Sequence, residues 1–175
     1  MKRIPFVFAI LAMFGATQAL AESFKVGSIE VEKPWIRATP KGASSAAGYF
    51  RITNSGTTAD RLTGGSSPIA GGIEIHEMST TNGVMKMRPL PNGLEIKPGE
   101  TVEVKPNSFH LMLVGLKQQV KQGDHVKGTL TFEQAGALEV EFTVESIGAQ
   151  QPASTGTGHT PTSPGMQMHP GMQMH

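Results

Sequence analysis

The sequence has 175 residues, of which 15 are basic and 14 acidic, and it contains no cysteine. This near-neutral charge excludes the dense basic surface that binding to nucleic acid or to an anionic membrane requires. Without cysteine the chain can form neither disulfides nor thiolate-ligated metal sites, so the fold must depend on its hydrophobic core.

Residues 1–21 have the pattern of a secretory signal peptide. Lys2 and Arg3 precede an apolar run from Ile4 to Gly15, and a small-residue cleavage site ends at Ala21. The alternative, a retained membrane anchor, is disfavoured because the run is shorter than the roughly 20 residues of a spanning helix. No cysteine follows, so we expect no lipidated N-terminus. The prediction is export to the periplasm without stable membrane association.

Residues 22–147 predict one all-β domain, since this length suffices for a single hydrophobic core. Apolar and polar side chains alternate, and Gly, Pro or Asn interrupts the alternation about every ten residues, as in a sandwich or barrel of short antiparallel strands. No segment predicts a helix of three turns. Strands are expected at residues 47–53, 73–78, 101–105, 126–133 and 138–144.

Several polar and glycine residues of this domain are expected to serve the fold alone. We interpret Asn54 and Asp60 as turn residues, and Gly64-Gly65 as loop glycines. His125 is expected in a turn beside the start of a strand. No motif of a metalloprotease, a serine hydrolase or a phosphate-binding loop is present, so catalysis is not predicted.

Methionine and histidine occur together in this domain, within residues 76–112. All four methionines of the domain lie there, beside two histidines. Methionine that only fills core gaps should be scattered among the other apolar residues. The clustering therefore predicts a metal site. The residues concerned are His76, Met78, Met85, Met87, His110 and Met112.

The alternation of the strands predicts which way these side chains point. Residues i and i+2 of a strand lie on the same face. Leu111 and its apolar neighbours define a core face, which places His110 and Met112 together on the opposite face. The isoleucines before His76 place His76 and Met78 away from the core in the same way. We expect two strands that each expose a histidine and a methionine.

The donor types select the metal. Zinc prefers His, Cys or carboxylate ligands, and calcium and magnesium require oxygen ligands. A blue-copper electron carrier needs a cysteine thiolate, which is absent. Neutral imidazoles and soft thioethers suit Cu(I). The predicted Cu(I) ligands are His76, Met87, His110 and Met112, with Met78 and Met85 as alternatives or supporting residues.

The C-terminal part has a different composition. Residues 148–163 predict a flexible linker of Gln, Pro, Ser, Thr and Gly. Residues 164–175 are two copies of Pro-Gly-Met-Gln-Met-His. We expect a metal-binding tail that accepts Cu(I) through its methionines and Cu(II) through its histidines. Its candidate ligands are His159, Met166, Met168, His169, Met172, Met174 and His175.

Six motifs of the domain resemble the periplasmic copper chaperones known as PCuAC, over about residues 29–144. Ten residues separate His76 from Met87, and 22 separate Met87 from His110, within the His…Met…His-x-Met pattern of that family. The motifs are Pro34-Trp-Ile-Arg-Ala-Thr-Pro40, Ala47-Gly-Tyr-Phe-Arg-Ile-Thr-Asn54, Asp60-Arg-Leu62, Ile75-His-Glu77, Met85-Lys-Met-Arg88 and His110-Leu-Met-Leu-Val-Gly-Leu116.

The resemblance implies a cupredoxin-like sandwich of immunoglobulin-like architecture, which binds Cu(I) near its surface through His76, Met87, His110 and Met112. It also implies copper delivery to the cytochrome c oxidase subunit that carries the copper centre, or to its assembly factors. The tail occurs in only some members of that family.

Three functions are compatible with these observations. The first is a chaperone that passes Cu(I) to a respiratory oxidase by ligand exchange, and the second is a scavenger or buffer that protects the periplasm from copper. The third, a copper oxidase or oxygenase, is disfavoured because the domain lacks the additional histidines that would stabilise Cu(II). We therefore expect a copper-binding protein that is not an enzyme.

Overall fold

The computed structural model describes residues 22–153, and every regular element in this range is a β-strand. The predicted all-β class is thus confirmed. Within the described range, no helix is long and apolar enough to cross a membrane. The predicted signal peptide, most of the linker and the tail lie outside it. The strands are β1 (Ser23–Val26), β2 (Ile29–Arg37), β3 (Ser45–Asn54), β4 (Asp60–Ser66), β5 (Gly72–Thr81), β6 (Val84–Pro89), β7 (Leu94–Ile96), β8 (Thr101–Val104), β9 (Phe109–Val114), β10 (His125–Phe132) and β11 (Gly136–Glu145).

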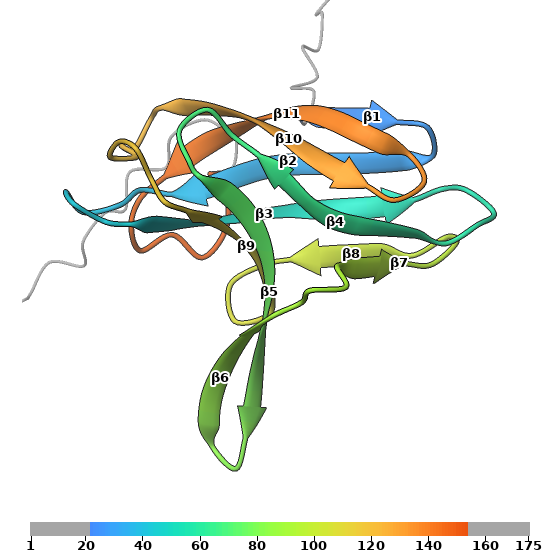
Figure 1. Cartoon of the computed structure of the whole chain (residues 1–175), viewed down its shortest axis with the longest axis horizontal. Coiled ribbons are helices and arrows are strands. Elements are labelled where there is room, and N and C mark those ends of the chain that lie inside the picture. Colours follow the sequence, from blue (N-terminus) through green and yellow to red (C-terminus); the bar gives the residue numbers. More distant parts are fainter. Residues whose placement is uncertain (1–21, 154–175) are drawn as a thin grey trace, which may run out of the picture.

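Seven of the strands form a closed path, which makes the sandwich a flattened barrel (Figure 1). The path runs β5-β9-β3-β2-β11-β10-β4 and returns to β5 through the pairing of Gly65 with Ile73. Most pairings are antiparallel, as expected, but β2 pairs with β11 and β8 with β9 in parallel. Closure removes most of the unpaired edges that an open sheet would expose.

The core lies inside this path and follows the alternation of the sequence. In β11, Leu138, Val140, Phe142 and Val144 are buried, and the residues between them are exposed or half-buried. In β5 and β9, Ile73, Ile75, Leu111 and Leu113 point into the same core. Each fully buried aliphatic or aromatic side chain stabilises the fold by about 1.5–3 kcal/mol.

The hairpin of β5 and β6 projects from the body of the barrel (Figure 1). Its two-residue turn is Asn82-Gly83, with φ of 53° and 75°. Positive φ at both positions is the requirement of a type I′ turn, which Asn-Gly satisfies. β9 pairs with β5 up to Glu77, so within residues 22–153 the outer half of the hairpin has β5–β6 as its strand pairing.

Gly64 and Gly65 lie within β4, which corrects their interpretation as loop glycines. A Cβ atom on Gly65 would lie 2.3 Å from the backbone oxygen of Thr129 in β10. No side chain fits there without moving one of the two strands. Gly65 therefore serves the close approach of β4 to β10, and the pairing register of these two strands also shifts beside Gly64.

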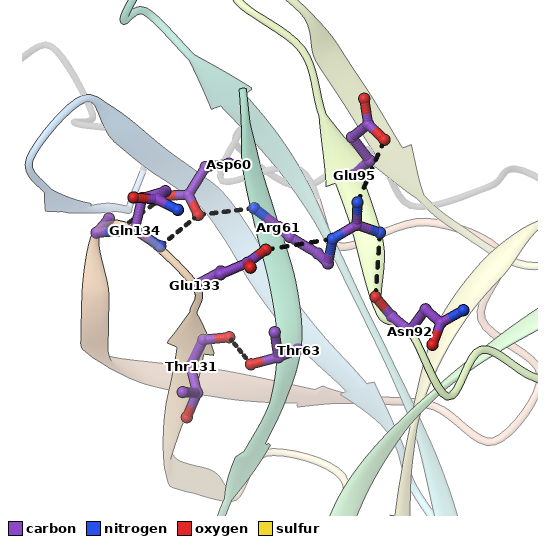
Figure 2. A network of polar contacts seen from close by, with 9 residues as sticks. Asp60, Arg61, Thr63, Asn92, Glu95, Thr131, Glu133 and Gln134 are labelled. Carbon is purple, nitrogen blue, oxygen red and sulfur yellow. Dashed lines mark hydrogen bonds and ion pairs between the residues drawn. The ribbon is translucent and has the colours of Figure 1, made fainter. Parts of the chain in front are cut away.

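Asp60 does more than form a turn. Its side chain is buried, with 6% of the residue exposed, and its carboxylate accepts three backbone hydrogen bonds (Figure 2). The N–H groups of Arg61 and Gln134 donate to Oδ1 at 2.7 and 2.9 Å, and that of Ala135 donates to Oδ2 at 2.9 Å. Asp60 thereby fastens the turn between β10 and β11 to the start of β4.

We expect Asp60→Ala to lower the free energy of unfolding by about 1–3 kcal/mol, because it leaves the partly buried N–H groups of Gln134 and Ala135 without their acceptor. Asp60→Asn keeps one acceptor oxygen and should cost less than the alanine substitution. Denaturant unfolding of both variants checks this. Equal, small losses would show that water replaces the carboxylate without penalty.

Candidate metal centre

Three neighbouring strands bring the predicted ligands to one face of the sheet. In the β5–β9 ladder His76 is opposite His110, and in the β5–β6 ladder Met78 is opposite Met87. Met112 is two residues beyond His110 on the same face. This arrangement gathers side chains that are up to 36 positions apart in the sequence.

Met87 contacts His110 directly, although β5 lies between their strands. The Met87 Sδ atom is 3.2 Å from Nε2 of His110. The ring centres of His76 and His110 are 5.6 Å apart. Met87 therefore reaches across β5 to the histidine pair. The structure brings three of the four predicted ligands together and places the fourth, Met112, on the same face of β9, about 7 Å along the strand from His110.

The two histidines are buried, which corrects the expectation that they are exposed. They do point away from the apolar core, as the alternation predicts, but His76 is 9% exposed and His110 5%. The reason is local: the Met87 side chain lies against His110, and the Glu74 carboxylate lies against His76. Met87 itself is 52% exposed. The imidazoles are thus shielded, and the solvent side of the centre is a thioether.

The surroundings of His110 define which nitrogen can bind a metal. Its Nδ1 lies 3.3 Å from the backbone oxygen of Ser108, which can only accept a hydrogen bond. The proton is therefore on Nδ1, and the lone pair of Nε2 faces the Met87 sulfur. Burial lowers the pKa of His110 below its ordinary value, and the proximity of His76 lowers it further, while the Ser108 carbonyl opposes both effects. The neutral, ligating form is favoured.

His76 has the complementary arrangement. Its Nε2 lies 2.8 Å from Oε2 of Glu74, and its Nδ1 is buried without a partner in the described structure. A carboxylate accepts hydrogen bonds, so Nε2 carries the proton and Nδ1 holds a free lone pair. Buried polar atoms without a hydrogen-bond partner are rare in folded proteins. Such an atom indicates that an ion or a water molecule binds at that position. A metal at Nδ1 would satisfy it.

Glu74 is a candidate site residue that sequence reasoning missed: its carboxylate lies 2.8 Å from Nε2 of His76. A carboxylate that accepts the second N–H of a ligating histidine fixes the ring and raises its basicity. The available signal was its position two residues before His76, on the same face of β5. Because i, i+2 pairs of charged and polar residues are common in strands, that signal alone is weak.

These residues fit a soft, monovalent metal ion. No group of three or more His, Asp or Glu side chains suited to a metal forms among residues 22–153, so a centre here must use the thioethers. Two imidazole lone pairs and a methionine sulfur carry no charge and match the preference of Cu(I). Met78 is half-buried beside Met87, and Met85 is exposed farther out on β6. The tail candidates His159, Met166, Met168, His169, Met172, Met174 and His175 lie outside the described residues.

The family of the chain follows from comparison with known proteins. Residues 29–144 match the family model described as "Putative lipoprotein LpqE-like". The chain belongs to the LpqE-like family. A relative of this LpqE-like protein, described as a putative lipoprotein of Leifsonia xyli subsp. xyli, is 32% identical over 119 residues, which are 68% of this chain and 70% of the relative.

Solved structures similar to the LpqE-like protein are copper-binding domains. The copper-bound PCuAC domain from PmoF2 is 27% identical, with a TM-score of 0.62, and the match covers 71% of this chain and 98% of that domain. The Cu(I) form of DR1885 from Deinococcus radiodurans is 29% identical, with a TM-score of 0.54, and the match covers 74% of this chain and 85% of that one. The family resemblance predicted from the motifs is therefore confirmed, together with the fold.

Proposed function

We propose that this LpqE-like protein is a periplasmic copper chaperone that binds one Cu(I) through His76, Met87, His110 and Met112 and passes it on. The observation that carries the proposal is the contact between Nε2 of His110 and Sδ of Met87, beside the unpartnered Nδ1 of His76. The first two atoms are neutral donors in direct contact, and the His76 ring centre lies 5.6 Å from that of His110, in a domain whose structural relatives include copper-bound and Cu(I) forms.

The exposure of Met87 favours transfer over permanent storage. Copper bound between shielded imidazoles and an exposed thioether is open to attack from the methionine side. An acceptor can add its own ligand there before the imidazoles release the ion, so no free copper forms. A resident cofactor would be better served by a fully enclosed set of ligands.

The recipient we propose is the copper centre of cytochrome c oxidase, or the factors that assemble it. The support is the resemblance to PCuAC chaperones. A family of proteins described as lipoproteins also agrees with export, and so with a periplasmic location. The functional groups of the centre are suited to holding Cu(I), and we propose no catalysis.

A deletion strain tests delivery. We expect it to lose most of its oxidase activity in copper-poor medium and to regain that activity when copper is added, because excess copper bypasses a carrier. A chain with His110→Ala should fail to complement the deletion at low copper. Normal oxidase activity at low copper, with poor growth only at high copper, would instead identify a buffer. The repeated Met and His residues of the tail are the feature that favours this second candidate function.

A further inference from the structure

Two methionines of the domain have no role in the proposed centre. Met78 is half-buried on β5, and Met85 is 55% exposed on β6. Within residues 22–153, neither belongs to the hydrophobic core or to the apolar side chains that pack against it. Val84, Met85 and Met87, all on β6, are three of the four large apolar side chains that are exposed in this range. Packing of the fold therefore does not account for the methionines of the hairpin.

The register of the β5–β6 ladder determines how these side chains meet. The Leu90 N–H donates to the Ile75 oxygen at 2.8 Å, so Ile75 and Leu90 form a hydrogen-bonded pair. Hydrogen-bonded and non-hydrogen-bonded pairs alternate along an antiparallel ladder. Counted outward from this pair, Met78 and Met87 form a non-hydrogen-bonded pair. In such pairs the two side chains lie closest together, so the Met78 thioether is the direct neighbour of the Met87 thioether.

Met85 is the diagonal neighbour of Met78. It is opposite Thr80, two residues farther along the ladder. Because residues i and i+2 of a strand share a face, Met78, Met85 and Met87 all lie on the same face of the hairpin. Diagonal pairs are about 7–8 Å apart, within reach of long side chains. Since the Met87 sulfur contacts Nε2 of His110 at 3.2 Å, the thioethers form a row that begins at the histidine pair and ends in solvent.

This face of the hairpin carries no charged side chain between Met78 and Met87. The basic residues of β6, Lys86 and Arg88, lie on the other face, where Arg88 is paired with Glu77 at 2.6–2.8 Å. A carboxylate beside the row would hold a copper ion there, and an ammonium group would repel it. The row therefore offers Cu(I) neutral, soft thioether donors without an opposing charge.

We propose that Met78 and Met85 form a second, weaker Cu(I) site, through which copper leaves the centre on its way to an acceptor. This inference rests on the proposed copper binding and extends it to an exit route. A bond from Cu(I) to one ligand of the centre breaks as a bond to the Met78 sulfur forms, and Met85 then binds in the same way. The ion remains Cu(I) and no proton moves, because thioethers are neutral before and after the exchange. Met87 remains a ligand of the centre and is not shared with the second site.

The second site must be weaker than the centre if copper is to pass through it. It has two thioethers and no imidazole, and the exposed Met85 side chain loses rotamer freedom when it binds a metal. Copper therefore rests at the centre and occupies the outer site only briefly. Such a site speeds transfer because it stabilises the intermediate of ligand exchange without stabilising the loaded state.

Transfer kinetics test the proposal. The full mature chain is loaded with one equivalent of Cu(I) and mixed, without oxygen, with a low concentration of a small soluble Cu(I) chelator, which has no protein surface to dock. Met85→Leu keeps the size and apolar character of the side chain and should slow transfer by about tenfold, because it removes a ligand of the intermediate. Its equilibrium affinity for Cu(I) should change by less than about twofold, since the loaded state is untouched.

Val84→Ala is the matched control for this substitution. Val84 is 57% exposed, close to the 55% of Met85, and lies on the opposite face of the same strand. It should change neither the rate of transfer nor the affinity. An unchanged rate in Met85→Leu would overturn the proposal. A loss of affinity in Met85→Leu as large as that in His110→Ala would make Met85 a ligand of the centre and would also overturn it.

NMR of the methionine methyl groups locates the ion directly. As Cu(I) is added, the methyl signals of Met78 and Met85 should move together, after the signal of Met87 has stopped changing. In Met85→Leu the change at Met78 should be lost. Movement of Met78 in step with Met87, or no movement of Met78 and Met85 at several equivalents of Cu(I), would overturn the proposal. Saturation of the Met87 signal by the first equivalent, and its loss in His110→Ala, report separately on the proposed function.

Discussion

His110→Ala in the chain ending at Ala153 should weaken Cu(I) binding by about 100-fold or more, because it removes the imidazole that faces Met87 and leaves a set of three ligands at most. Met87→Ala should also weaken binding strongly. The measurement is anaerobic competition with a Cu(I) chelator of known affinity.

His125→Ala is the matched control for this substitution. His125 starts β10, is exposed, and its Nδ1 lies 3.0 Å from Glu141, so its removal should change Cu(I) affinity by less than about twofold. Equal losses for His110→Ala, Met87→Ala and His125→Ala would contradict the assignment. Because His110 is buried, its alanine variant should also be less stable without copper, by about 1–2 kcal/mol, whereas the exposed Met87 variant should change by less than about 1 kcal/mol.

Cu(I) affinity should be nearly constant above neutral pH and should fall steeply in acid. Each imidazole must be neutral to bind, so affinity falls about tenfold per pH unit for each histidine once the pH is below its pKa. Burial lowers the pKa of His110, so this ligand should remain available somewhat below its ordinary value near 6.5. Thioethers do not titrate, so the fall should level off at the affinity that the methionines alone supply once both imidazoles are protonated. A loss that continues steeply below about pH 4 would indicate carboxylate ligands instead.

The same shift has a defined effect on the stability of the copper-free protein. Since the pKa of His110 is lower in the folded than in the unfolded chain, the unfolded chain binds the proton more readily. The contribution of His110 to stability is complete above the unfolded pKa near 6.5, declines as the pH falls, and levels off below the folded pKa. Thermal unfolding of the wild type and of His110→Ala between pH 8 and pH 4 would isolate the pH-dependent contribution of His110 to the stability of the folded protein.

Local pattern was enough to predict which face each strand presents. Alternation around Ile75 and Leu111 placed both histidines opposite the core, and the strands expected at residues 73–78 and 138–144 lie within the observed β5 and β11. The choice of a soft metal also followed from residue types alone. These features depend on neighbours two positions apart, which a sequence displays directly.

What could not be predicted depends on residues that meet only in three dimensions. His110 is buried because Met87 crosses β5 to reach β9, and neither pairing of β5 can be deduced from its own residues. Gly65 looked like a loop glycine because its reason for being glycine is a backbone oxygen 64 positions later in the sequence. The role of Glu74 required knowing which nitrogen of His76 remains free.

The proposed ligands are divided between the closed barrel and the edge strand β6, and this division has a consequence for the rate of copper transfer. The histidines and Met112 belong to strands of the closed barrel, whereas Met87 belongs to β6, which among the described strands pairs with β5 alone. Lifting β6 would detach one ligand without disturbing the core, in a step that involves no second molecule. If this step limits copper transfer, the observed rate should rise with acceptor concentration at low concentration and then reach a plateau equal to the opening rate of the hairpin.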